Sequence, residues 1–198
     1  AALIARKVAP ALAAGCSVIV RPSVEVPGVA MIMFDCLREA GMPAGVANLL
    51  IGPTGSTYKP IMASPLVRKV SLTGSTRVGQ QMIRDSAETV KRVSMELGGN
   101  APFIVFDDAD MDKAVTMAMA CKFRNAGQTC ICANRFLVQN GVVETFVTNL
   151  LDHISDMRVG DGLKPETDMG PLINADAVAH TDALVKDAVE KGAQLLFG

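Results

Sequence analysis

The residue best suited to covalent chemistry in this chain is a cysteine in a polar turn. Residues 123–135 read FRNAGQTCICANR and place Cys130 among amide and hydroxyl side chains, between an expected helix and an expected strand. A nucleophilic cysteine needs a favoured thiolate form or a nearby base, and it needs backbone donors for the oxyanion that it creates. A loop that holds two buried cysteines explains the spacing equally well, because cysteine is often a small core residue.

A lone acidic residue, Glu96, stands at the carboxyl end of an otherwise apolar strand, in the segment SMELGGN. Burial at that point would favour the neutral carboxyl group and suit a general base. An ordinary exposed carboxylate at the end of a strand is the alternative, and it is the commoner case for acidic residues.

A third segment, LTGSTRVG at residues 72–79, predicts a strand, a glycine-containing turn and the start of a helix. The free amide groups at such a helix N-terminus suit a phosphate. Of the three glycines in the dinucleotide fingerprint, only two are present here, Gly74 and Gly79. The segment alone is therefore weak evidence for a cofactor.

These segments lie on a chain that alternates short apolar runs with longer helical patterns. In residues 1–98 this order predicts parallel strands joined by helical crossovers, and so an open α/β sheet in which residues 17–20 are a buried strand. Ligands of such sheets bind at the carboxyl ends of the strands. The expected strands are residues 17–20, 46–52, 67–74 and 91–97, and the expected helices are residues 2–14, 27–40, 56–63 and 76–88.

The glycine pair Gly98-Gly99 predicts a domain boundary, with one domain over 1–98 and another over 99–198. In the second domain, Asp107, Asp108 and Asp110 precede a helix and suit its positive N-terminal end. The expected order there is a strand at PFIVF, a helix at 110–123, a strand at 135–139, a helix at 142–157, a helix at 175–191 and a last strand beginning at QLLF.

Composition excludes several classes of partner. With 49% apolar residues, 20% charged residues and a net charge of -1, the chain has no basic field for nucleic acid or an anionic membrane. Charged residues interrupt the apolar N-terminal stretch, so no run is long enough to span a bilayer. The five cysteines form no C-x-x-C pair, and both histidines lie far from them, so we expect no metal site and a reducing, cytoplasmic compartment.

Together, SMELGGN and FRNAGQTCICANR resemble the paired active-site signatures of the aldehyde dehydrogenase superfamily. Other segments match in the same order: AALIARKVAPALAAGCSVIVRPS, GMPAGVANLLIG, VSLTGSTRVG, APFIVFDDADMDKAV and MGPLI. The resemblance spans essentially the whole chain and its motifs are highly specific. It implies the C-terminal part of a Rossmann-like cofactor-binding domain over 1–98 and the N-terminal part of an α/β catalytic domain over 99–198.

By this resemblance, Cys130 attacks an aldehyde to form a thiohemiacetal, hydride passes to a nicotinamide, and Glu96 activates the water that hydrolyses the resulting thioester. The resemblance also implies cofactor contacts. Gly74 and Ser75 match positions that meet the cofactor phosphates, in the segment that ends at Gly79, and Leu97 matches a position against the nicotinamide.

Within the superfamily, the chain looks most like the succinate-semialdehyde dehydrogenases. Their substrate carries a carboxylate at its far end, which an arginine clamp can hold. Arg6 and Arg124 match the two clamp positions, although most arginines are simply surface residues. We therefore expect a small acid semialdehyde as substrate, with glutarate semialdehyde and related acids as further possibilities.

The cofactor segment RPSV departs from the family pattern. Arg21 stands where lysine is typical, and Val24 stands where NAD-preferring members often carry a glutamate. Without that carboxylate a 2′-phosphate is not repelled, and Arg21 and Ser23 could bind it. We expect NADP, with NAD accepted, although the neighbouring Glu25 could complicate this preference.

Cys132 forms a C-x-C pair with Cys130 that resembles a redox switch of this subfamily, in which a disulfide blocks the nucleophile. A plain packing cysteine is an equally good interpretation. A stand-alone thiol redox module is disfavoured, because the chain has no thioredoxin-like motif.

Compared with the family, whose full-length members are homo-oligomeric, the chain is much less than a full subunit. The alternative to an active enzyme is therefore a truncated, catalytically inactive fragment with at most weak nucleotide binding.

Overall fold

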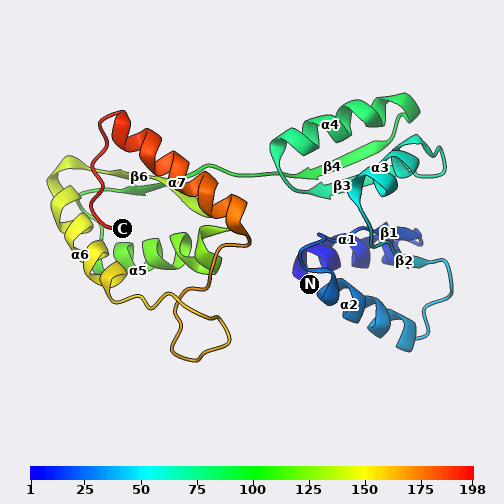
Figure 1. Ribbon diagram of the computed structural model, residues 1–198, viewed down its shortest axis with the longest axis horizontal. Coiled ribbons are helices and arrows are strands. Elements are labelled where there is room, and N and C mark those ends of the chain that lie inside the picture. The colour runs from blue at the N-terminus through cyan, green and yellow to red at the C-terminus, as the bar shows by residue number, and fades with distance from the viewer. The chain divides into compact units, whose positions relative to one another are not determined.

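The computed structural model describes every residue from Ala1 to Gly198. The chain forms two compact units, Ala1–Gly98 and Gly99–Gly198 (Figure 1). The division falls at the glycine pair of the sequence, while the assignment of the units as cofactor-binding and catalytic domains stays a prediction. None of the helices combines the length and the apolar run needed to cross a membrane.

The first unit alternates strands and helices throughout. Both of its strand pairs are parallel, β1 with β2 and β3 with β4, because a helix connects the two strands of each pair. The elements are α1 Ala2–Ala13, β1 Val18–Val20, α2 Pro27–Glu39, β2 Ala47–Leu49, α3 Thr54–Ala63, β3 Lys69–Thr73, α4 Thr76–Ser86, η1 Ala87–Thr89 and β4 Arg92–Glu96.

The α/β class and the parallel pairing are confirmed, but the single open sheet predicted for this unit is wrong. The strands form two separate two-stranded sheets, and the side chain of Ile19 on β1 is 52% exposed, so β1 is not a buried strand. Alternating strands and helices predict parallel crossovers, but they do not say which crossover pairs share a hydrogen-bond ladder.

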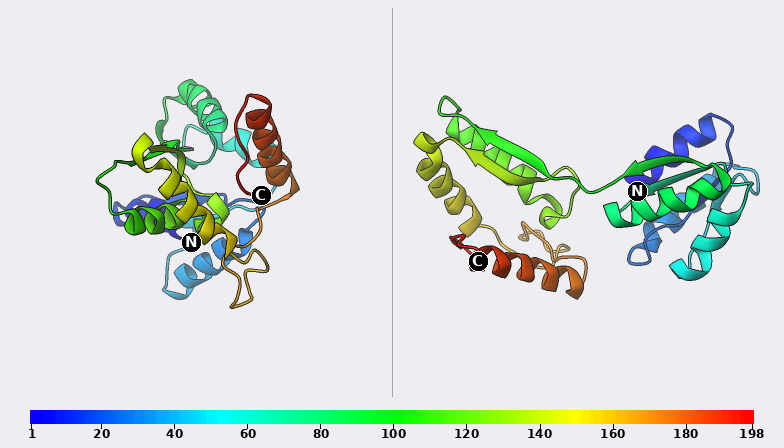
Figure 2. Two further views of the ribbon diagram at one scale, coloured as in Figure 1. Left: turned by 90° about the vertical axis from the view of Figure 1, so that its left-hand side faces the viewer. Right: turned by 90° about the horizontal axis from the view of Figure 1, so that it is seen from above.

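The second unit contains β5 Ala101–Val105, α5 Met111–Lys122, η2 Arg124–Gly127, β6 Ala133–Val138, η3 Asn140–Val142, α6 Val143–Ser155 and α7 Ala175–Glu190. Strands β5 and β6 are parallel, and α5 runs alongside them (Figure 2). The expected last strand at QLLF is wrong, since residues 193–198 have no regular structure.

A small apolar core holds α5 and α6 on the β5–β6 pair. Its buried side chains are Val105, Ala114, Val115, Ala118 and Phe146, and the Phe103 and Phe136 rings pack beside them with centroids 5.2 Å apart. Asp110 caps α5 by accepting a hydrogen bond from the Lys113 amide at 3.2 Å, as its position in the sequence predicts. The core therefore fixes the C-terminal end of α5, from which the cysteine-bearing turn departs.

Candidate active site

Glu96 is the last residue of β4 and pairs in register with Thr73 on β3. Its side chain is exposed, which is the commoner of the two cases that the sequence left open for this carboxylate, and its role as general base stays a prediction. Its carbonyl oxygen accepts a hydrogen bond from the Gly74 amide at 3.0 Å. The turn after β3 is therefore fastened directly to the backbone of the predicted general base.

A lysine missed by the sequence analysis lies close to this carboxylate. Lys7 on α1 donates a hydrogen bond from Nζ to Ser71 Oγ on β3, at 2.9 Å. Partial burial lowers the pKa of the Lys7 ammonium group, whereas the negative charge of Glu96 acts to raise it. No local pattern could have found this pair, because the two residues stand far apart in the sequence and meet only when α1 packs near β3 and β4.

The turn between β3 and α4 has the features that a phosphate site needs, with one change from the prediction. The Gly74 amide is not free, since it binds the Glu96 carbonyl. Ser75 caps α4, accepting from the Val78 amide at 3.3 Å, and the first-turn amides of Thr76 and Arg77 have no acceptor within the helix. These two amides are therefore available to an anion, while the contact of Gly74 and Ser75 with cofactor phosphates stays a prediction.

Gly79 and Leu97 are brought together by the packing of α4 on the end of β4. Gly79 is buried, and a Cβ atom at this position would lie only 2.6 Å from Cδ2 of Leu97. Both residues were predicted to line the cofactor site. The absence of a side chain at Gly79 lets α4 and Leu97 approach each other closely.

Arg21, predicted to bind a 2′-phosphate, is already bound within the first unit. Its guanidinium donates to Thr57 Oγ1 at 3.0 Å, Thr54 Oγ1 at 2.5 Å and the Gly52 carbonyl at 3.3 Å. Ser23 and Val24 are exposed, and Ser23 Oγ accepts from the Glu25 amide. A 2′-phosphate at Arg21 would have to share or replace these hydrogen bonds.

Cys130 is exposed in the turn that connects η2 to β6, so a loop with two buried cysteines is excluded. Its carbonyl oxygen lies so close to Gly99 that a Cβ atom at Gly99 would collide with it. The second glycine of SMELGGN, interpreted from the sequence only as part of a boundary, therefore has a packing role. Any side chain at Gly99 would displace the backbone that carries Cys130.

Cys132 has the opposite environment. Its side chain is 1% exposed, shares a hydrogen bond with Thr129 Oγ1 at 2.6 Å and donates to the Cys121 carbonyl at 3.0 Å. It is a buried residue whose hydrogen bonds join the turn containing Cys130 to the C-terminal end of α5. A disulfide with Cys130 would require Cys132 to leave these partners, and the redox switch stays a prediction.

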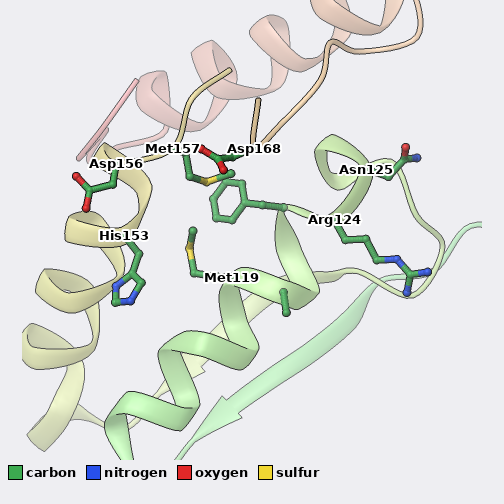
Figure 3. Close-up of a pocket in the computed structure, with 9 residues that line it drawn as sticks. Met119, Arg124, Asn125, His153, Asp156, Met157 and Asp168 are labelled. Atoms are coloured by element: carbon green, nitrogen blue, oxygen red, sulfur yellow. The ribbon is translucent and has the colours of Figure 1, made fainter. Parts of the chain in front are cut away.

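The two predicted clamp arginines are exposed, and neither guanidinium has a hydrogen-bond or ion-pair partner. Arg6 is on α1 in the first unit and Arg124 begins η2 in the second. Arg124 borders a pocket of about 470 Å³. Figure 3 shows its side chain and that of Asn125 extending away from Met119 and His153, so the guanidinium does not fill this pocket.

Comparison with known proteins identifies the family to which the chain belongs. The model of the aldehyde dehydrogenase family matches residues 1–198, the whole chain. The chain belongs to the aldehyde dehydrogenase family. Within this family it is 50% identical over 198 residues to a succinate-semialdehyde dehydrogenase [NADP(+)] of Escherichia coli and 52% identical over 197 residues to a 3-sulfolactaldehyde dehydrogenase of Pseudomonas putida.

Solved structures agree with this assignment. The succinate-semialdehyde dehydrogenase of Burkholderia pseudomallei matches 100% of this aldehyde dehydrogenase chain with a TM-score of 0.98 and 48% identity. The chain spans 41% of that structure, and 41% and 40% of the two curated relatives above. The predicted nucleophile and its predicted base lie in different units of the chain, with Glu96 in the first and Cys130 in the second.

Proposed function

We propose that the protein containing this chain oxidises an aldehyde to a carboxylic acid with NADP or NAD. The observation that carries the proposal is the exposed Cys130 thiol on a hydrogen-bonded turn, in a chain of the aldehyde dehydrogenase family. Its thiolate attacks the carbonyl carbon, a carbon–sulfur bond forms, and the carbonyl becomes the oxyanion of a thiohemiacetal. The thiol alone could not complete an oxidation, so a hydride acceptor is required.

The first unit fits such an acceptor. Unbonded amides at the start of α4 suit the phosphates of a dinucleotide, and the missing side chain at Gly79 lets Leu97 lie against α4. A bound nicotinamide would supply the hydride acceptor that oxidation of the thiohemiacetal to a thioester requires. Glu96 then takes a proton from water, the water oxygen attacks the thioester, and the Cys130 thiolate leaves as the acid forms.

An acid semialdehyde is the proposed substrate. The exposed, unpaired guanidinium groups of Arg6 and Arg124 support this, because each can bind a carboxylate in bidentate fashion. Three similar proteins are named for succinate semialdehyde, glutarate semialdehyde and 3-sulfolactaldehyde, all of which are aldehydes with an acidic group. A cytoplasmic location and a homo-oligomeric full-length protein complete the proposal.

NADP is the proposed preferred cofactor, with NAD accepted. Val24 is an exposed apolar residue at a position where a carboxylate would favour NAD. One relative is also named for NADP. A Val24→Glu variant should raise the KM for NADP and lower that for NAD, because the new carboxylate repels a 2′-phosphate and accepts from ribose hydroxyls. The proposal is wrong if the unmodified full-length protein already prefers NAD.

The test of the mechanism is reduced-cofactor formation by the full-length protein and two variants. Cys130→Ala should abolish turnover with succinate semialdehyde. Glu96→Gln should slow steady turnover by roughly a hundredfold to ten-thousandfold while leaving an initial burst of reduced cofactor, since hydride transfer precedes hydrolysis. Cys36→Ala and Glu88→Gln change an exposed thiol and an exposed carboxylate of the same types, and should leave turnover unaltered.

Two results would contradict this mechanism. One is turnover that survives Cys130→Ala. The other is an equal loss of the burst and of steady turnover in Glu96→Gln, which would place Glu96 before hydride transfer.

A further inference from the structure

The segment between Arg124 and Cys130 contains three consecutive residues in the left-handed backbone region. Asn125 has φ 54°, Ala126 φ 55° and Gly127 φ 73°. Glycine adopts this region freely and asparagine tolerates it, but alanine there is strained. Such a turn persists only if its surroundings hold it.

The amide side chains at the two ends of the turn hold it reciprocally. Asn125 Nδ2 donates to the Gln128 carbonyl at 3.2 Å, and Gln128 Nε2 donates to the Asn125 carbonyl at 3.1 Å. The Gln128 backbone amide binds the same Asn125 carbonyl at 3.1 Å. We call this set of hydrogen bonds the Asn125–Gln128 clasp.

Gln128 also fastens the turn to a distant part of the second unit. Its Oε1 accepts a hydrogen bond from the Ile173 amide at 2.9 Å, in the segment that precedes α7. Each end of the Gln128 amide group therefore has a partner. The turn between Arg124 and Cys130 is thus closed on itself and anchored from outside.

Burial indicates that these bonds serve local geometry rather than general stability. Asn125 and Gln128 are exposed, and neither belongs to the apolar core around Val105 and Phe146. Two residues after Gln128 comes Cys130, and Arg124 directly precedes Asn125. The turn therefore sets how the predicted nucleophile and the predicted clamp arginine are placed along one short loop.

We propose that Gln128 is a positioning residue. Through the clasp and its hydrogen bond to Ile173, it holds Cys130 and Arg124 at the separation that an acid semialdehyde requires. The proposal rests on the proposed function for the roles of those two residues. Gln128 itself takes part in no bond-making step. Loss of its amide lets the strained turn relax, which misplaces the thiol relative to the bound carboxylate.

Gln139 provides a matched control for this proposal. It is an exposed glutamine of the same unit whose amide is also bonded at both ends, with Oε1 accepting from the Asp107 amide at 2.9 Å and Nε2 donating to Asp107 Oδ2 at 3.0 Å. Its bonds lie at the other end of β6 from the cysteine turn. If the loss of a glutamine acts only through folding, Gln128→Ala and Gln139→Ala should have the same effect.

The experiment compares the full-length protein with Gln128→Ala, Gln139→Ala and the double variant Gln128→Ala/Ala126→Gly. Two readouts are measured: kcat and KM for succinate semialdehyde, and the alkylation rate of Cys130 by iodoacetamide, followed by mass spectrometry of its peptide. Gln128→Ala should lower kcat/KM roughly tenfold to hundredfold and change the alkylation rate, because small misplacements of reacting groups carry costs of this size. Gln139→Ala should leave both readouts unchanged.

The double variant tests whether strain in the turn is the cause. Glycine at position 126 adopts the left-handed region freely, so it should recover much of the activity lost in Gln128→Ala. Equal losses in the two glutamine variants, or no rescue by Ala126→Gly, would overturn the proposal. If the unmodified protein oxidises no semialdehyde, the proposed function fails, and the alkylation rates alone still decide whether Gln128 positions Cys130.

Discussion

Cys130 and Cys132 stand two positions apart and have opposite surroundings. The first is exposed, while the second is buried and bonded to Thr129 and the Cys121 carbonyl. On spacing alone, a nucleophile and a pair of buried thiols were equally good interpretations of the C-x-C pair, and only the family resemblance favoured the nucleophile. The fold adds which of the two thiols is exposed, because burial depends on how α5 and β6 enclose the turn.

Arg124 is the residue on which substrate choice can be tested. Its exposed guanidinium has no partner in the structure, so it is free to bind a carboxylate. Arg124→Ala should raise KM for succinate semialdehyde about tenfold to a hundredfold, as expected for the loss of a charge-assisted hydrogen bond of about 1.5–3 kcal/mol. For an uncharged aldehyde such as butanal, KM should change little.

Arg38→Ala is the matched control for that substitution. Arg38 is also an exposed arginine, and its only ion pair is with Asp35 on the same helix. Steady-state kinetics with both aldehydes should show no change in this variant. If Arg124→Ala raises KM for both aldehydes by the same factor, the clamp assignment is refuted.

At the scale of elements, the helices were the most predictable parts. The expected helix at 110–123 is α5, Met111–Lys122, and the expected helix at 175–191 is α7, Ala175–Glu190. Their apolar periodicity and the capping residue Asp110 are local signals. Sheet membership depends on contacts between distant segments, which explains why the division into separate two-stranded sheets was not predictable.

The parts of the site that were missed are also non-local or strained. The ammonium group of Lys7 interacts with the charge of Glu96 only after the chain has folded. Glycine is needed at position 99 only because the Cys130 carbonyl approaches it. The left-handed turn at Asn125 and Ala126 contradicts the preference of alanine, so propensity could not have predicted it. Such departures from local preference are expected at functional sites.

The contact of α4 with the end of β4 gives a prediction at this scale. In Gly79→Ala the new methyl group meets Leu97, which must turn away, and overpacking of this kind costs about 1–3 kcal/mol. Because Leu97 is predicted to lie against the nicotinamide, the variant should also bind NADP more weakly. Thermal unfolding and a titration of cofactor fluorescence measure the two effects.

Gly55 on α3 is the comparison for Gly79. A Cβ atom there meets nothing within 4 Å, so Gly55→Ala should be neutral or stabilising by about 0.4–1 kcal/mol. Cofactor affinity should not change. If Gly79→Ala bound NADP as tightly as the unmodified protein, Leu97 would have no role in the cofactor site.

At the scale of the whole molecule, the described chain leaves much apolar surface uncovered. Ile32, Phe106 and Ile131 are each more than 60% exposed, and the chain spans between 37% and 41% of the length of the curated relatives that it matches. Experiments on activity therefore belong to the full-length protein.

The central claim is that Cys130 carries the substrate as a thioester that Glu96 helps to hydrolyse. Its most direct test is to mix full-length Glu96→Gln protein with succinate semialdehyde and NADP, quench in acid, and locate the acyl group by peptide mass spectrometry. The account predicts a succinyl group on Cys130 together with about one reduced cofactor per subunit in the first turnover. An acyl group on another cysteine, or reduced cofactor formed without any adduct on Cys130, would contradict it.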